Sequence, residues 1–434
     1  SRLAAHPQIK ESVVTVVHTH RATPEGELQY CTRCGLASNF PGASYDDQGV
    51  CHLCRAYDSY KDRAQAYFKP MTELQALFEQ MKSGRNGDYD CVALFSGGKD
   101  STYMVAQLVA AGLKVLTFTL DNGYISEQAK ANIRRVAATL KVDHIFGTTP
   151  AMNAIFVDSL KQFANVCNGC FKTIYTLAVN LAREKGIRYI VTGLSRGQFF
   201  ETRLTPEVFQ DPNFNVEEID RSILAARKAY HRRDDVISRE LDVDAFRSDA
   251  VFEDIQFIDF YRYCDVSLGD LYACLDQYVP WVRPSDTGRS TNCLINDLGI
   301  YLHKKQRGYH NYALPYSWDV RMGHKQRDEA LDELNDAIDE TQVKRMMQEI
   351  GYAEPNVNDD PSAKRLAAYY VAEGALTSSD VRGYLSQHLP EFMLPSYFIR
   401  LDSLPLTRNG KIDRMALPDP QSDRPELASA YQPP

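Results

Sequence analysis

Two groups of residues in this sequence of 434 residues have types and spacings that suit chemistry. The first is SGGKDS, Ser96 to Ser101, which lies between an apolar run and a helical pattern. Its glycines allow a close backbone approach, Lys99 supplies positive charge, and the start of a helix offers free N–H groups to phosphate oxygens. The spacing differs from that of a Walker A loop, GxxxxGK[ST]. We therefore predict a phosphate-binding loop of another type, with a plain Gly-Gly turn as the alternative.

The second group is a double CxxC pattern, in which Cys31 and Cys34 are followed by Cys51 and Cys54 after sixteen intervening residues. Two such pairs supply four thiolates to one tetrahedral ion, and this spacing lies within the range of structural zinc sites. We predict a knuckle in which Zn²⁺ stabilises the fold. Four free thiols are the alternative.

The loop SGGKDS resembles the PP-loop of the ATP pyrophosphatases, which include sugar amidotransferases, tRNA thiolases and argininosuccinate-type ligases. The resemblance implies an enzyme that cleaves ATP between the α and β phosphates, uses Mg²⁺ to neutralise phosphate charge, and passes AMP to a carbonyl or amide oxygen. A nucleophile then displaces AMP. The nucleotide-binding residues that it implies are Ser96, Gly97, Gly98, Lys99, Asp100, Ser101, Leu120, Asn122 and Gly193, and the implied catalytic residues include Lys99, Asp100 and Asp121. Asp121 could instead cap a helix.

A third pair, Cys167 and Cys170, lies where sulfur-inserting members of this group carry a CxxC that faces the activated substrate. In those enzymes the pair either holds a [4Fe-4S] cluster with a third cysteine, leaving one iron open, or carries a persulfide. The resemblance implies a third catalytic cysteine later in the chain, and we predict that it is Cys293, because the polar, glycine-containing stretch DTGRSTNC is typical of an exposed loop at a site. We expect the remaining cysteines to pack in the core, as free cysteine usually does: Cys91, Cys264 and Cys274.

Residues 281–329 are rich in Arg, His, Asn and Tyr and resemble the C-terminal half of the amidotransferase-like group, as the knuckle resembles its N-terminal part. The site candidates in this stretch are Arg283, Asp286, Arg289, Asn292, His310, Arg321 and His324. Their alternative role is a hydrogen-bonded scaffold. We expect the basic run at 227–233 to be a solvated face rather than a nucleic-acid patch.

A second resemblance concerns the two ends of the sequence. LPEFMLPSYF at 389–398 and LPLTRNGKIDR at 404–414 resemble motifs in the C-terminal subdomain of the adenylation domains of nonribosomal peptide synthetases. By position, Lys411 corresponds to the mobile lysine that reaches the acyl-adenylate, and a surface lysine after a turn is the alternative. Residues 3–17 resemble the start of the same subdomain, so we expect their strand to pair with the strand at 363–371.

The elements that must position these residues alternate between strands and helices. Strands are expected at 89–95, 115–120 and 189–192, and helices at 71–81, 99–111, 126–140 and 173–185. This alternation predicts an α/β fold with a parallel sheet, of the HUP-like PP-loop type. The predicted domains are 1–22 with 362–418 as a split α+β adenylation subdomain, 28–70 as the zinc knuckle, 71–350 as the pyrophosphatase with a helical insertion at about 201–255, and 419–434 as a linker toward a carrier protein.

The composition sets limits on partners and location. A formal net charge of -8 argues against a general nucleic-acid-binding surface, and no apolar run is long enough to span a membrane. The start lacks the pattern of a signal peptide, so we expect a soluble, cytoplasmic protein. The expected partners are the adenylation core subdomain and carrier protein of the same synthetase, together with a protein that donates sulfur or ammonia.

The expected function is a tailoring domain of a peptide synthetase that adenylates a substrate oxygen, releases pyrophosphate and replaces the oxygen by sulfur. Three alternatives stay open. The domain could be an amidotransferase that takes ammonia from a partner glutaminase, a non-catalytic structural insertion, or a tRNA-modifying enzyme. The acidic balance and the flanking synthetase motifs disfavour the tRNA-modifying enzyme.

Overall fold

The polypeptide divides into two compact units, residues 23–353 and residues 1–22 with 354–434. The computed structural model describes residues 6–18, 28–204, 208–209, 215–283, 285–287, 292–354, 364–373, 376–386, 395, 397–405, 412 and 417. Lys411, Arg289 and the predicted linker 419–434 lie outside these residues. Among the helices of the described residues, none has the length and apolar character needed to cross a bilayer.

Five parallel strands in the order β4-β3-β2-β5-β6 form the sheet of the central unit. They are β2 (Cys91–Leu94), β3 (Val115–Leu120), β4 (Asp143–Gly147), β5 (Tyr189–Thr192) and β6 (Gln256–Asp259). The helices α3 (Lys99–Ala110), α4 (Glu127–Leu140), α5 (Met152–Phe163) and α6 (Cys167–Glu184) connect β2 through β5. The predicted α/β class with a parallel sheet is confirmed. The edge strands β4 and β6 were not predicted from the sequence, because both are short and begin or end with polar residues.

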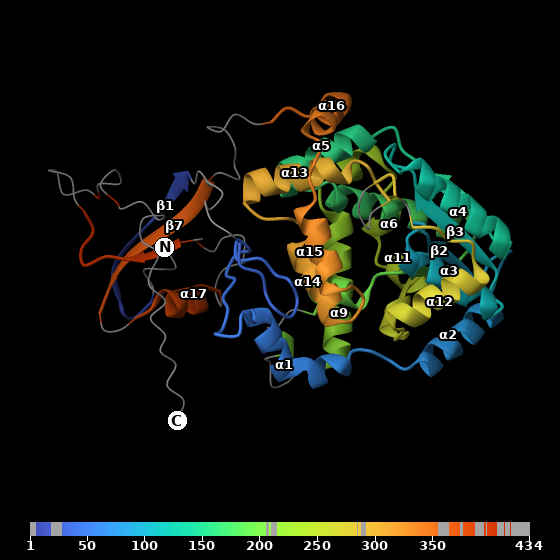
Figure 1. Cartoon of the computed structure of the whole chain (residues 1–434), viewed down its shortest axis with the longest axis horizontal. Coiled ribbons are helices and arrows are strands. Elements are labelled where there is room, and N and C mark those ends of the chain that lie inside the picture. The colour runs from blue at the N-terminus through green and yellow to red at the C-terminus, as the bar shows by residue number, and fades with distance from the viewer. Residues whose placement is uncertain are drawn as a thin grey trace. The chain divides into compact units, whose positions relative to one another are not determined.

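Helices cover both faces of this sheet (Figure 1). Because side chains alternate along a strand, Cys91 and Ala93 face one side, where they pack with Met104 of α3. Val92 faces the other side and packs with Ala178 of α6. The short strand β2 is therefore buried on both faces, which accounts for its continuous apolar sequence.

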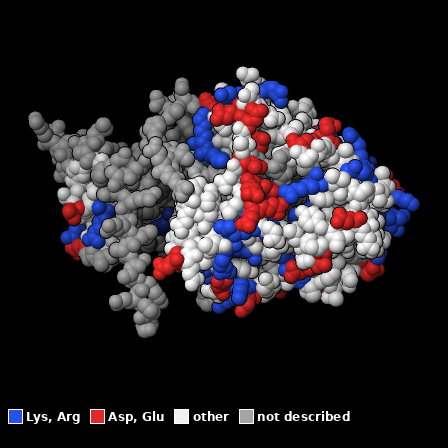
Figure 2. Space-filling view, in the orientation of Figure 1, with Lys and Arg blue, Asp and Glu red and all other residues white. Residues whose placement is uncertain are grey.

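The other helices of the central unit surround this core. They are α1 (His52–Gln65), α2 (Met71–Ser83), α7 (Arg196–Thr202), α9 (Val216–Arg232), α10 (Val236–Glu240), α11 (Ala250–Asp254), α12 (Leu268–Tyr278), α13 (Asn296–Arg307), α14 (Ala313–Arg321), α15 (Arg327–Asn335) and α16 (Glu340–Ile350), with the 3-10 turns η2 (Asp244–Arg247) and η3 (Phe260–Arg262). On the face drawn in Figure 2, acidic and basic side chains of the described residues are interspersed.

The second unit contains a three-stranded sheet of β1 (Ile9–His18), β7 (Lys364–Ala372) and β8 (Tyr397–Arg400), with helix α17 (Ser378–Ser386). Strands β1 and β7 are antiparallel, and β8 runs parallel to β7. Tyr370 packs with Val381 of α17 on one face of this sheet, while Tyr369 packs with Ile399 on the other. The predicted pairing of the two sequence ends is confirmed.

Candidate active site

The loop from Ser96 to Gly98 joins β2 to α3 in the middle of the sheet. Its neighbours β3 and β5 lie on opposite sides of β2, so the order of strands reverses direction here. A crevice forms outside the carboxyl ends of the strands at such a point, and α/β proteins bind ligands there. Asn122, which follows β3, and Gly193, which follows β5, therefore converge on the loop.

The backbone of the loop has the shape expected for anion binding. Gly97 has a φ of +77°, and a Cβ at this position would lie 2.6 Å from Cγ1 of Ile133. Gly98 is the N-cap of α3, and no side chain of the described residues caps this end of the helix. The first N–H groups of α3 are therefore available to a ligand.

Hydroxyl groups and a close strand approach fix the loop. The Ser96 and Ser101 hydroxyl oxygens lie 3.0 Å apart, and the Thr102 hydroxyl donates to the Gly98 carbonyl at 2.8 Å. A Cβ at Gly193 would lie 3.2 Å from the Ser101 Cα, closer than an ordinary van der Waals contact, so glycine lets β5 end this close to α3 without displacing it.

Two side chains that are distant from the loop in sequence donate hydrogen bonds to its backbone carbonyl groups. The Trp281 indole N–H donates to the Gly97 carbonyl at 2.9 Å, and the Asn292 amide donates to the Ser96 carbonyl at 2.7 Å. Unpaired carbonyl oxygens would repel phosphate. These hydrogen bonds engage the carbonyl groups of Ser96 and Gly97 with protein donors instead. The start of α3 has no side-chain cap among the described residues, and Gly98 and Lys99 line the adjoining cavity.

A cavity of about 480 Å³ opens in front of the loop. Of the nucleotide-binding and catalytic residues predicted from the sequence, those that line it are Ser96, Gly98, Lys99, Asp100, Ser101, Leu120, Asn122, Cys167, Cys170, Gly193 and Cys293. Gly97 and Asp121 do not line it. Asp121 pairs with Lys130 at 3.0 Å. Because Ser126 caps the following helix, the alternative role of Asp121 as its cap is wrong.

The charged groups of this cavity interact closely. The Lys99 amine lies 2.8 Å from the Asp100 carboxylate. Burial would lower the pKa of Lys99, but Asp100 and Asp319 outweigh burial, so its pKa lies above the usual value and the amine stays charged. Burial raises the pKa of Asp319 to about 6, although its carboxylate accepts a hydrogen bond from the Ser195 hydroxyl at 2.8 Å.

The three predicted catalytic cysteines come together at one side of this cavity. The Asn122 amide lies 3.2 Å from the Cys293 sulfur and 3.6 Å from the Cys170 sulfur. The Cys167 sulfur lies 3.7 Å from the Tyr312 hydroxyl. Burial raises the pKa of Cys293 to about 12 and raises that of Cys170 as well, so both are protonated thiols in the absence of a cation.

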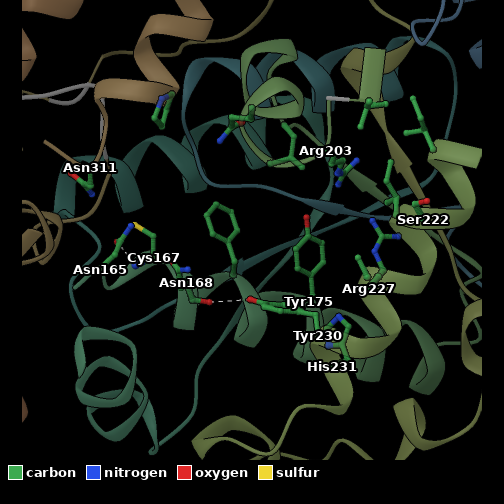
Figure 3. A pocket seen from close by; sticks show the side chains of 18 of the residues that line it. Asn165, Cys167, Asn168, Tyr175, Arg203, Ser222, Arg227, Tyr230, His231 and Asn311 are labelled. Atoms are coloured by element: carbon green, nitrogen blue, oxygen red, sulfur yellow. Dashed lines mark hydrogen bonds between the residues drawn. The ribbon is translucent and has the colours of Figure 1, made fainter. Parts of the chain in front are cut away.

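A second cavity, of about 1090 Å³, adjoins the first. Seven residues line both cavities: Cys167, Phe171, Tyr175, Leu194, Gln198, Tyr312 and Pro315. Figure 3 shows Cys167 and Asn168 on one side of this cavity, with Arg203, Ser222 and Arg227 on the other. A molecule bound in the second cavity can thus reach the cysteines and the space in front of the loop.

The four cysteines of the knuckle form a separate, buried cluster. Their ligand atoms lie within 4.8 Å of one another, with Cys31 and Cys54 sulfurs 3.9 Å apart and Cys34 and Cys51 sulfurs 3.6 Å apart. Tetrahedral Zn²⁺ with bonds of about 2.3 Å separates its sulfurs by about 3.8 Å, so these residues fit the ion. In the part of the chain that the structure describes, no other group of three or more Cys, His, Asp or Glu residues meets this distance.

The candidates in the stretch 281–329 divide between several places. Arg283, Asn292 and His324 line the cavity of the loop. Asp286 instead accepts the Gln128 N–H at 3.3 Å, and His310 accepts the Tyr312 N–H at 3.1 Å. Neither lines the cavity.

Arg321 belongs to the knuckle rather than to the cavity. Its guanidinium lies 3.1 Å from the Cys34 sulfur and 3.2 Å from the Cys54 sulfur. Four thiolates on one Zn²⁺ leave a net charge of -2, which this buried cation partly offsets. A role of Arg321 at the nucleotide site is therefore not supported by the geometry.

Several residues that line the cavity were not singled out from the sequence. They are Tyr272, Trp281, Tyr316, Asp319, Lys325 and Glu329. Most lie within the polar stretch 281–329, where the composition indicated a site but gave no means of choosing Asp319 over its neighbours. Tyr272 lies on α12, whose pattern is that of an ordinary amphipathic helix.

Comparisons with known proteins agree with this geometry. Residues 90–201 match the family of the queuosine biosynthesis protein QueC, and residues 356–411 match the AMP-binding enzyme C-terminal domain. The chain thus carries a PP-loop domain of the ATP pyrophosphatase class within an adenylation domain of the nonribosomal peptide synthetase type.

The curated relatives are peptide synthetases. Bacitracin synthase 2 of Bacillus licheniformis is 51% identical over 76 residues, which are 18% of this chain and 3% of that protein. Tyrocidine synthase 1 of Brevibacillus parabrevis is 46% identical over 76 residues, 18% of this chain and 7% of that protein. The chain therefore spans a small fraction of these relatives. Among solved structures, NMN synthetase from Francisella tularensis aligns with a TM-score of 0.33 and 10% identity, over 66% of this chain and 96% of that chain.

Proposed function

We propose that the central unit is an ATP-dependent tailoring enzyme that adenylates an oxygen of a substrate of peptide-synthetase assembly and then replaces this oxygen by sulfur. The observation that carries the proposal is the meeting of two cavities at Cys167. One contains the phosphate-binding loop, and the other has room for a substrate.

The proposed reaction has two balanced steps. The substrate oxygen attacks the α-phosphorus of ATP, the bond to the β-phosphate oxygen breaks, and pyrophosphate leaves. A sulfur nucleophile then attacks the activated carbon, and AMP departs with the original oxygen. In the first step, Lys99 and the N–H groups at the start of α3 hold the departing pyrophosphate. Asp100 and Asp319, which line the cavity, would hold the Mg²⁺ that accompanies the nucleotide.

The cysteines fit a [4Fe-4S] cluster better than a single metal ion. Their sulfurs are not all within 4.8 Å of one another, whereas one tetrahedral ion needs a separation of about 3.8 Å. Cys170 and Cys293 need a cation to become thiolates, and the Asn122 amide donates to both sulfurs, as groups around a cluster do. Cys167, Cys170 and Cys293 would hold such a cluster, which would supply a site for sulfur.

Two measurements test this proposal. Binding of α,β-methylene-ATP, followed by calorimetry, should weaken at least about tenfold in Lys99→Ala, since a charge-assisted contact to phosphate is lost. Lys161→Ala, an exposed change on α5, is the matched control. Equal affinity in both variants would exclude the loop as the nucleotide site.

The second measurement is iron and acid-labile sulfide per chain after anaerobic purification. About four irons should be present, and Cys167→Ala, Cys170→Ala and Cys293→Ala should each lose them. Cys274→Ala, outside the set, should keep them. Absence of iron from the wild type would favour a persulfide on these cysteines or amidotransfer with ammonia, which the amidotransferase-like knuckle and residues 281–329 support.

A further inference from the structure

The second cavity, of about 1090 Å³, is called the large cavity below. It contains positive charge at the end away from Cys167 (Figure 3). Arg203 forms a salt bridge with Asp259, a short contact between two side chains that are each 11% exposed. Arg227 lies beside this pair, with its guanidinium carbon 4.2 Å from the centre of the Phe257 ring. Among the described residues, Arg227 has no salt-bridge or hydrogen-bond partner. The guanidinium groups of Arg203 and Arg227 therefore lie near a single carboxylate, that of Asp259.

In the part of the chain that the structure describes, nearby groups do not balance this charge. Burial, with Lys172 and Arg227, lowers the pKa of His231 to about 3, so His231 is neutral. Lys172 forms its own salt bridge with Asp235 at 2.5 Å. Among the described residues that line the cavity, the one acidic residue is Glu218, which is exposed and lies 3.8 Å from Arg221.

The negative charge of the Asp259 carboxylate is already compensated by its salt bridge with Arg203. Burial would raise its pKa, but Arg203, Arg227 and the Thr192 hydroxyl outweigh burial, and the pKa lies below the usual value. The group is therefore ionised and accounts for one of the two positive charges. A guanidinium cannot lose its proton to relieve the remaining charge. A half-buried cation without a partner is costly, and a bound anion removes this cost.

We infer that the large cavity binds a carboxylic acid whose carboxylate pairs with Arg227, while the rest of the molecule extends toward Cys167. A planar guanidinium takes both oxygens of one carboxylate. A phosphate dianion calls for a second free cation, which Arg203 cannot supply because Asp259 holds it. Apolar and aromatic side chains, including Tyr175, Val208 and Ile223, surround the path between the two ends. The role of the part of the ligand that extends toward Cys167 rests on the proposed function, whereas the carboxylate site at Arg227 does not.

The test uses the full chain without ATP and phenylacetate as the probe. Calorimetry should detect saturable binding of phenylacetate below about 50 mM, and phenylacetamide, which lacks the charge, should bind at least about tenfold more weakly. Arg227→Met should reduce the affinity for phenylacetate by a similar factor. Arg221→Met, on the same helix α9 but at the surface, should not change it.

Three outcomes would overturn the inference: no saturable binding of phenylacetate, equal binding of the amide, or unchanged affinity in Arg227→Met. Tighter binding of phenyl phosphate than of phenylacetate would reject the carboxylate in favour of a phosphate. If Arg227→Met fails to fold, Arg227→Gln replaces it. Since no ATP is present, a failure here is distinct from a failure of α,β-methylene-ATP binding, which tests the proposed function.

Discussion

Replacing Gly97 by Ala should destabilise the central unit by about 2 to 5 kcal/mol. The φ of +77° costs an L-residue about 1 to 2 kcal/mol. The new methyl group would lie 2.6 Å from Cγ1 of buried Ile133, and such overpacking costs a further 1 to 3 kcal/mol or so. Gly112→Ala separates these contributions, because Gly112 has a φ of +79° with no atom within 4 Å of the added Cβ.

Urea unfolding followed by tryptophan fluorescence measures the difference. The chain has two tryptophans, Trp281 and Trp318, and both lie in the central unit, so the signal reports on that unit alone. Trp281 also donates to the Gly97 carbonyl, which makes its emission sensitive to the loop. We expect Gly97→Ala to cost about 1 to 3 kcal/mol more than Gly112→Ala.

A double-mutant cycle identifies the source of that excess. Ile133→Ala removes the atom that the new methyl group meets, so the extra cost of Gly97→Ala should disappear in this background. Equal costs for Gly97→Ala and Gly112→Ala, or an excess that persists beside Ile133→Ala, would refute the steric argument for the shape of this loop.

Three further perturbations test other parts of the structure. Arg321→Met should speed zinc release to a chelator by about tenfold, since it removes the cation beside the knuckle sulfurs, whereas Arg33→Met at the surface should not. Asp319 has a pKa of about 6 in the fold and 3.8 as its ordinary value, so the native state binds its proton more tightly. The free energy of unfolding should therefore fall as pH rises from about 4 to 6, and Asp319→Asn should flatten this slope in urea titrations at several pH values. Lys172→Met leaves Asp235 buried without its cation and should cost about 3 to 5 kcal/mol in the same unfolding assay, while little change would show that water solvates the carboxylate.

The sequence was most informative where local chemistry determines local structure. SGGKDS predicted a loop between a strand and a helix, because Gly97 needs a positive φ and Gly98 begins a helix without a side-chain cap. The double CxxC pattern likewise predicted four clustered thiols, which Cys31 to Cys54 supply. In both cases the residue types and spacings within one short segment were sufficient for the prediction.

Roles that depend on distant contacts could not be read in the same way. We expected the run 227–233 to be a solvated face, and this was wrong for Arg227, which lines a cavity and stacks on Phe257 from an edge strand. Arg321 was grouped with the nucleotide site because of its neighbours in sequence, yet α14 directs it to the knuckle sulfurs. A charge pattern along one helix does not reveal which buried group lies opposite.

The segment around Asn292 and Cys293 links the two halves of the proposed chemistry. Asn292 donates to the Ser96 carbonyl of the phosphate-binding loop, and its own carbonyl accepts the Ser126 N–H at 2.9 Å. The next residue, Cys293, pairs through its backbone with Ile125 and places its sulfur beside Asn122. One short stretch of backbone therefore holds both the loop and a sulfur ligand. Since a shift of this stretch would move both, the position of the nucleotide and that of the incoming sulfur are set together.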